Sequence, residues 1–197
     1  KAKEWAGQAK LVFLAHPAGA DDAREFGYPG SVYLGPPPQW RVEYETVVQA
    51  KAENWRSKMR KRIGIGEVTF GLEQNDKMVG LIGGKDPEEN NRVIKLLVAV
   101  VLGMEKDNIV IAFGRHPGEK SNPDKPGDKE RFERASAERS KILEGIWTGV
   151  INDTNVWKEG SRIAGAADVM VYASGTNISI AGAYARVPAV YLDDEGV

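Results

Sequence analysis

Residues 78–87 read Met-Val-Gly-Leu-Ile-Gly-Gly-Lys-Asp-Pro, and this stretch decides the fold class. Met78–Ile82 is a short, continuous apolar run, which is typical of a strand that is buried on both faces of a parallel sheet. Gly83-Gly84-Lys85 reads as a turn. Asp86-Pro87 then predicts the start of a helix, because aspartate caps free amides and proline suits the first helical position.

Strand and helix patterns alternate outward from this stretch. Between Val93 and Met104, apolar residues recur at spacings of three and four, which gives a helix with one buried face. We expect further strands at 11–15, 31–34, 108–113, 148–151, 169–173 and 189–192, and further helices at 19–26, 130–143, 155–166 and 178–186. This order predicts an α/β fold, with a Rossmann-like parallel sheet and helices on both of its faces.

Proline and glycine punctuation predicts the domain organisation. Pro36-Pro37-Pro38 can extend neither a sheet nor a helix, so these prolines mark a boundary. We expect residues 1–40 to be the remnant of an N-terminal αβ domain, 41–75 to be a helical linker with a helix from Val42 to Arg62, and 76–197 to be a Rossmann-like domain. Because no helix follows the strand at 189–192 to cover it, we expect the chain to be part of a larger two-domain protein, truncated in its last domain.

Composition excludes several function classes. The chain has 27 basic and 28 acidic residues, so no overall field would recruit nucleic acid or an anionic membrane. It contains no cysteine, which removes disulfides and thiolate chemistry. No motif calls for a metal or an organic cofactor, and no apolar run is long enough for a transmembrane segment. We therefore expect a cytoplasmic protein without a nucleic-acid partner.

The predicted sheet brings three candidate segments to one edge, because ligands bind beyond the carboxyl ends of parallel strands. These segments are Gly83-Gly84-Lys85, Arg115-His116 and Ser174-Gly175-Thr176-Asn177. In the last, a Ser/Gly/Thr turn opens a helix and directs free amides at one spot, which favours an anion such as phosphate. A nucleophilic role for Ser174 is rejected, since the glycine pattern of a nucleophile elbow is missing.

The first two segments each leave an alternative open. Lys85 could contact phosphate or serve only the turn, since the acidic residues at the start of the next helix can satisfy its charge. Arg115 offers a bidentate phosphate donor, and His116 could carry a proton near neutral pH or be merely structural. We therefore expect the loss of Arg115 to weaken nucleotide binding more than the loss of Lys85.

Together, these motifs resemble the C-terminal, donor-binding domain of GT-B fold glycosyltransferases, in the group of lipid A disaccharide synthase and UDP-N-acetylglucosamine 2-epimerase. The resemblance is carried by Met78–Gly84, Phe113–Pro117, Ala166–Val169, Ser174–Thr176 and Arg186–Tyr191. Phe26–Pro29 and Val32–Pro36 are similar to the end of that family's N-terminal domain.

The resemblance implies a nucleotide-diphosphate-sugar-dependent glycosyltransferase, with a UDP-sugar as the first expected donor and a missing N-terminal domain facing this one. Gly83 and Gly84 would then lie near the diphosphate, Arg115 and His116 near the phosphates or the sugar, and Ser174–Asn177 at the phosphate-binding helix start. His116 is the one catalytic candidate. Many members carry a ribose-binding glutamate where this chain has Ala181. That departure favours the alternatives, a non-catalytic nucleotide- or phosphate-binding module or a sugar-nucleotide epimerase.

Overall fold

The computed structural model describes residues 11–14, 21, 24–25, 31–34, 38–64, 68–104, 108–116, 118–122, 124–150, 156–172 and 179–192. The chain divides into two units, Lys1–Glu45 and Thr46–Val197. The first unit contains β1 (Leu11–Leu14) and β2 (Ser31–Leu34), which pair in parallel. The sequence predicted both strands, whereas most of the helix predicted at 19–26 lies outside the described residues.

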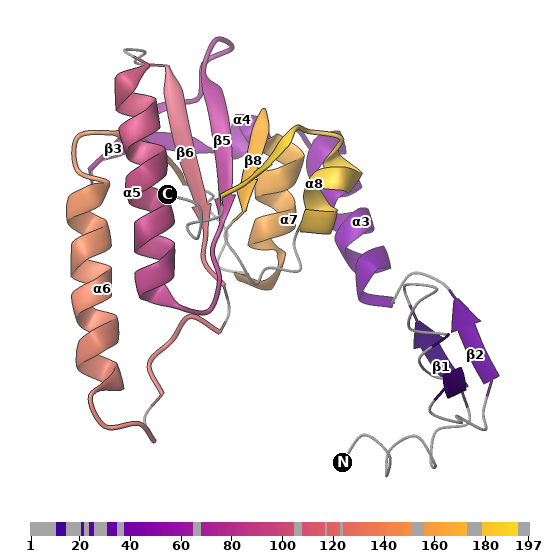
Figure 1. The fold of residues 1–197 in the computed structure, drawn as a ribbon. Coiled ribbons are helices and arrows are strands. Elements are labelled where there is room, and N and C mark those ends of the chain that lie inside the picture. Colours follow the sequence, from indigo (N-terminus) through magenta and orange to yellow (C-terminus); the bar gives the residue numbers. More distant parts are fainter. Residues whose placement is uncertain are drawn as a thin grey trace. The chain divides into compact units, whose positions relative to one another are not determined.

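The second unit is built on a seven-stranded sheet with the order β4-β3-β7-β6-β5-β8-β9 (Figure 1). The strands are β3 (Arg60–Ile63), β4 (Val68–Gly71), β5 (Lys77–Ile82), β6 (Ile109–Gly114), β7 (Trp147–Val150), β8 (Val169–Tyr172) and β9 (Ala189–Tyr191). The strands from β7 to β9 are parallel, and β3 is antiparallel to both of its neighbours. Counted from β5, the parallel strands run 3-2-1-4-5, which are the first five positions of the Rossmann order 3-2-1-4-5-6. The chain thus has the Rossmann-like α/β fold that the sequence predicted.

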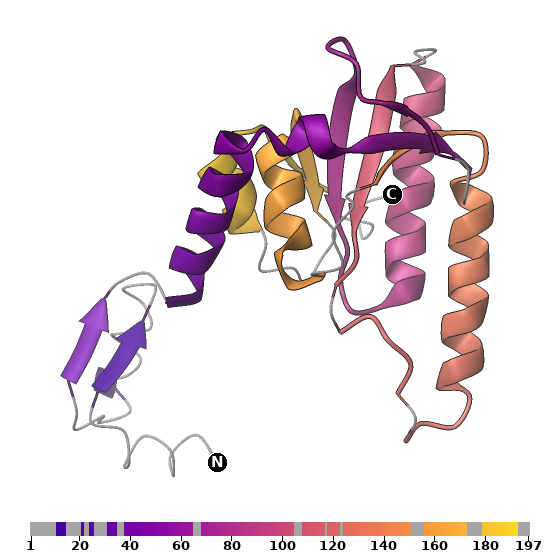
Figure 2. The same cartoon turned by 180° about the vertical axis from the view of Figure 1, so that it is seen from behind.

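Helices cover both faces of this sheet (Figures 1 and 2). On one face lie α5 (Pro87–Gly103) and α6 (Asp128–Ile142), and on the other lie α4 (Trp55–Lys58), α7 (Val156–Ala166) and α8 (Ser179–Ala185). The sequence predicted all of these helices, with the residues of α4 as part of one longer helix. None of the helices among the described residues is long and apolar enough to cross a membrane.

Two apolar cores flank the sheet, and the central strand β5 contributes to both. Met78 and Ile82 join Ile163 of α7 in one core, while Leu81 joins Ile94 of α5 in the other. Because β5 is covered on both faces, its sequence is a continuous apolar run instead of an alternating one. This is the physical reason why residues 78–82 identified the sheet from the sequence alone.

The predicted linker helix is wrong in its second half. Helix α3 (Pro38–Ala52) ends well before the predicted limit, and after the single turn of α4 the chain enters strand β3 at Arg60. Asn54, between the two helices, has a φ of 47°, a left-handed conformation that interrupts a helix. In β3, the buried Lys61 donates to Asp76 Oδ1 at 3.1 Å. Pairing with β4 and β7 therefore overrides a composition that favours helix.

Gly80 tests the fit between β5 and α7. A Cβ atom on Gly80 would lie 2.8 Å from Ile163 Cγ2 and 3.2 Å from Ala167 Cβ, so only glycine fits this approach. We expect Gly80→Ala to lower the free energy of unfolding by about 1–3 kcal/mol through overpacking, as measured by urea denaturation. Gly103→Ala is the control, since nothing lies within 4 Å of its added Cβ. An equal loss in both variants would contradict this account of Gly80.

Candidate functional site at the carboxyl edge of the sheet

The carboxyl ends of β5, β6 and β8 lie side by side. Ile82 is paired with Gly114 on one side and with Tyr172 on the other, so the segments after these strands start at the same edge. The direction of the strand order reverses between β5 and β8, which is where open α/β sheets bind ligands. The segment Ser174–Asn177 lies outside the described residues, and its role as an anion site stays a prediction.

The two glycines after β5 are tightly packed, and their amides already have acceptors. Gly83 N donates to Gly114 O at 3.0 Å, and Gly84 N donates to Asn90 Oδ1 at 2.7 Å. A Cβ on Gly83 would lie 2.9 Å from the side-chain amide of Asn90 and 2.9 Å from Phe113 Cε2. The glycines therefore allow α5 to close against β6. Since the amides of Gly83 and Gly84 are already bonded, the side chain of Lys85 is the group in Gly83-Gly84-Lys85 that we consider for anion binding.

Asp86 occupies the N-terminus of α5, as the sequence predicted. Its Oδ1 accepts from the amides of Glu88 at 2.9 Å and Glu89 at 3.4 Å, and it pairs with Arg131 at 2.8 Å. Burial acts to raise the pKa of Asp86, but the bonds from Glu88 N, Arg131 and Glu89 N outweigh burial and lower it. A protein carboxylate thus fills the place that a bound phosphate takes at other helix N-termini.

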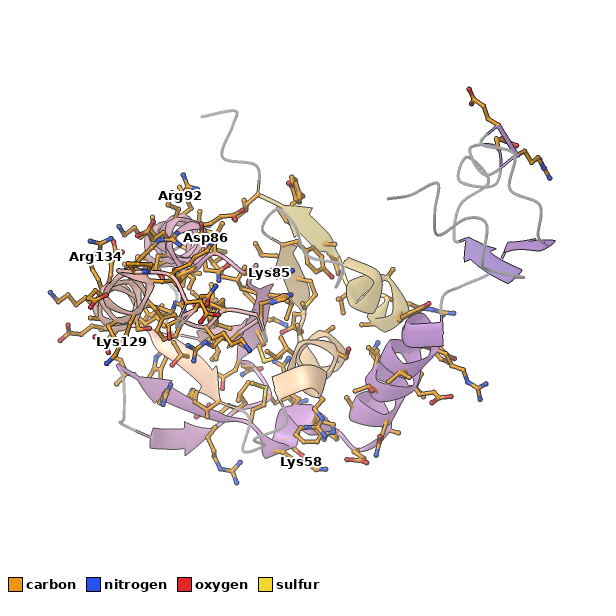
Figure 3. The ribbon with its side chains drawn as sticks, turned by 90° about the horizontal axis from the view of Figure 1, so that it is seen from below. Lys58, Lys85, Asp86, Arg92, Lys129 and Arg134 are labelled. Carbon is orange, nitrogen blue, oxygen red and sulfur yellow. The ribbon has the colours of Figure 1, made fainter. Side chains whose placement is uncertain are left out.

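These pairings bear on the two alternatives for Lys85. In one of them, the acidic residues at the start of α5 satisfy the charge of this lysine. Instead, Asp86 pairs with Arg131, and Glu88 pairs with Arg131 at 3.2 Å and with Arg134 at 3.1 Å. Lys85 is exposed and has no ion-pair partner among the described residues (Figure 3). Its ammonium group is therefore available to a ligand.

A basic cleft opens beside Lys85. This edge cleft has a volume of about 170 Å³ and is lined by Lys85, Pro87, Lys120, Asn122, Lys125, Asp128, Arg131 and Phe132. Arg131 is held by Asp86 and Glu88, and Asp128 accepts from the amide of Asn122. The side chains of the three lysines have no ion-pair partner in the part of the chain that the structure describes. Asp128 is the one acidic side chain in the lining, so the lining residues together carry a net positive charge.

His116 lies next to Lys85. Gly118 N donates to His116 Nδ1 at 2.8 Å, so the neutral ring carries its proton on Nε2. A Cβ on Gly118 would lie 3.0 Å from this Nδ1 and 3.3 Å from Lys85 Cγ, which shows that the two segments meet as predicted. Burial and the charge of Lys85 lower the pKa of His116, and Glu119 opposes them. At pH 7 the imidazole is mainly neutral and can donate one hydrogen bond from Nε2.

A buried network holds this loop in place, and the sequence analysis missed it. Asn90, which is 1% exposed, donates from Nδ2 to Gly84 O at 3.0 Å and to Glu119 Oε2 at 2.9 Å. The other carboxylate oxygen of Glu119 pairs with Arg139 of α6. This chain of bonds links the β5–α5 turn, the loop after β6, and α6. The polar pair Asn90-Asn91 on the apolar face of a helix could have indicated this network in the sequence, because buried polar side chains need hydrogen-bond partners.

Arg115 lies elsewhere on the same side of the sheet. Its guanidinium is 4.9 Å from the centre of the Phe132 ring on α6, and it lines a second pocket instead of the edge cleft. No carboxylate pairs with it among the described residues. Its role in diphosphate binding stays a prediction.

Comparison with known proteins adds no relative. The sequence matches no model of a known protein family and no curated protein. The class therefore rests on the fold and the site: a Rossmann-like α/β protein with a basic cleft at the carboxyl edge of its parallel strands.

The ion pair between Arg139 and Glu119 should be essential for stability. Their side chains are 11% and 0% exposed, so Arg139→Met would leave a buried charge without its partner. We expect this variant to lose about 3–5 kcal/mol in urea unfolding at pH 7. Adding Glu119→Gln should recover part of the loss, because the unpaired charge is then gone. The control Arg134→Met breaks an exposed pair on the same helix and should lose less than about 1 kcal/mol.

The environment of His116 gives a prediction for its titration. NMR titration should give His116 a pKa below the ordinary 6.5, and Lys85→Ala should raise that pKa, since the lysine charge disfavours the imidazolium. Because the folded pKa is depressed, the contribution of His116 to stability is complete above pH 6.5 and is lost as pH falls through the folded pKa. An unchanged pKa in Lys85→Ala would show that the two side chains do not interact.

Proposed function

We propose that this chain is the donor-binding half of a nucleotide-diphosphate-sugar-dependent glycosyltransferase, with a UDP-sugar as the first candidate donor. The proposal is supported by the edge cleft, in which three lysines without ion-pair partners among the described residues come from the segments that follow β5 and β6 in a sheet with the order 3-2-1-4-5. A diphosphate is the ligand part that such a cluster of point charges suits, because it spreads negative charge over several oxygens.

The binding chemistry would rest mainly on side chains. The amides of Gly83 and Gly84 are already bonded within the protein, so Lys85, Lys120 and Lys125 would supply the positive charge. Such binding weakens as salt rises, since the lysines that face solvent are screened. In a transfer reaction, the same charges would stabilise the departing diphosphate, and His116 Nε2 would donate a hydrogen bond to it.

A non-catalytic nucleotide-binding module is the second candidate function. It is favoured by Ala181, which stands at the position where many members of the resembling family have a ribose-binding glutamate. It is also favoured by Asp86, whose carboxylate already caps the N-terminus of α5. Both functions share the edge cleft and differ only in turnover. Release of UDP from a panel of UDP-sugars by the full-length protein would support transfer, while binding without release would support the module.

Lys85 tests the binding site that both candidates share. We expect UDP to bind in calorimetry, and Lys85→Ala to weaken binding about tenfold or more through the loss of a charge-assisted contact. Lys77→Ala is the matched control, because Lys77 is an exposed lysine at the amino end of β5, the strand that precedes Lys85. It should leave the affinity unchanged. No heat with UDP, ADP or GDP on folded protein, or equal effects of both variants, would reject the site.

A further inference from the structure

A second pocket remains that the proposed function does not use. This arginine pocket has a volume of about 250 Å³ and lies between α6 and strands β3, β6 and β7. Three arginines and three hydroxyl groups line it: Arg62, Arg115, Arg139, Ser136, Ser140 and Thr148. Ser140 and Thr148 already donate to backbone carbonyls, so the guanidinium groups are the main donors of the pocket. A concentration of guanidinium groups of this kind points to an anionic ligand.

Arg62 provides the strongest evidence. Its Nε is buried and has no hydrogen-bond partner among the described residues. Its position is fixed, because Thr148 lies directly opposite it on β7 and donates from Oγ1 to Arg62 O at 3.3 Å. A guanidinium N–H is a strong donor, and a buried donor without an acceptor is rare in folded proteins. The unpartnered Nε therefore shows that the described part of the protein supplies no full set of acceptors for the Arg62 guanidinium, which lines the pocket.

The charges of the pocket are not balanced within the described residues. Arg139 is neutralised by Glu119 and also donates from Nε to Asn91 Oδ1 at 3.0 Å. Neither Arg62 nor Arg115 has an ion-pair partner in the described part of the chain. Two positive charges thus face a small space, which matches a group with two negative charges and several acceptor oxygens. A phosphoryl group has these properties.

The remaining lining is apolar and argues against a bare inorganic ion. Ile111, Phe113 and Leu143 form this part of the pocket, and the Phe113 ring lies 4.7 Å from the guanidinium of Arg139. Apolar walls with a few polar groups are typical of sites for small organic ligands. We propose that the arginine pocket binds a small phosphate monoester, with its phosphoryl group on Arg62 and Arg115 and its carbon skeleton against the apolar wall.

This pocket is separate from the edge cleft, although the two share a wall. Phe132 lines the edge cleft, and Arg115, which lines the arginine pocket, packs against the ring of Phe132. The lysines of the edge cleft do not line the arginine pocket. The two sites can therefore be tested independently.

Phenyl phosphate is a suitable probe, because it combines a phosphoryl group with a small apolar body. We expect it to bind to the folded chain in calorimetry, and Arg62→Met to weaken binding by about tenfold to hundredfold. Arg60→Met is the matched control: Arg60 is exposed, lies on the same strand and face, and does not line the pocket. The absence of binding, or equal effects of both variants, would overturn the proposal. Inorganic phosphate binding as tightly as phenyl phosphate would overturn the ester assignment.

Thermal unfolding separates a ligand-binding Arg62 from a structural one. Without ligand, Arg62→Met should melt at the same temperature as the wild type or higher, because it removes an unsatisfied buried donor. Phenyl phosphate should raise the melting temperature of the wild type and of Lys85→Ala, but not of Arg62→Met. A ligand-free Arg62→Met that melts clearly lower would support a structural role instead. Loss of phenyl phosphate binding in Lys85→Ala would place the ligand in the edge cleft and overturn the proposal.

Discussion

The ion pair between Arg139 and Glu119 is the interaction on which the carboxyl edge of the sheet depends. Both side chains are almost fully buried, so neither charge can be left without the other. The carboxylate of Glu119 also accepts a hydrogen bond from Asn90, which in turn is bonded to the turn after β5. The backbone amide of Glu119 donates to His116 O. The pair therefore sets where His116 and the loop after β6 lie, and its arginine forms part of the second pocket.

Both edges of the sheet contain ion pairs, but they differ in the basic side chains that are left without a partner. At the amino edge, Asp168 accepts from Met78 N at 2.7 Å and pairs with Arg56 at 3.0 Å, and the buried Lys61 pairs with Asp76. These charges hold α4 and β3 against the parallel strands. At the carboxyl edge, the side chains of Lys85, Lys120 and Lys125 in the edge cleft have no ion-pair partner among the described residues. Satisfied charge is typical of a structural role, whereas accessible charge of one sign in a cleft indicates ligand binding.

Helix α6 connects the two proposed sites. Arg131 and Phe132 near its start line the edge cleft, and Ser136, Arg139 and Ser140 further along line the arginine pocket. Because the spacing of three to four residues places these side chains on one face of the helix, a single element contributes to both. A chain with a net charge of −1 can thus offer two local positive sites for anionic ligands.

The sequence by itself determined the fold class and the edge at which a site should lie. The apolar run 78–82, the Asp86-Pro87 cap and the apolar periodicity of α5 depend on local chain geometry, and the structure confirms all three. Only the tertiary structure decided that residues 60–63 form the strand β3. It also decided that Asp86 and Glu88 pair with α6, which leaves Lys85 available to a ligand. Finally, it placed Arg62 beside α6, where both line a pocket. These features depend on contacts between residues far apart in the chain. Local propensity carries no information about such partners, since burial and pairing arise only when the elements pack.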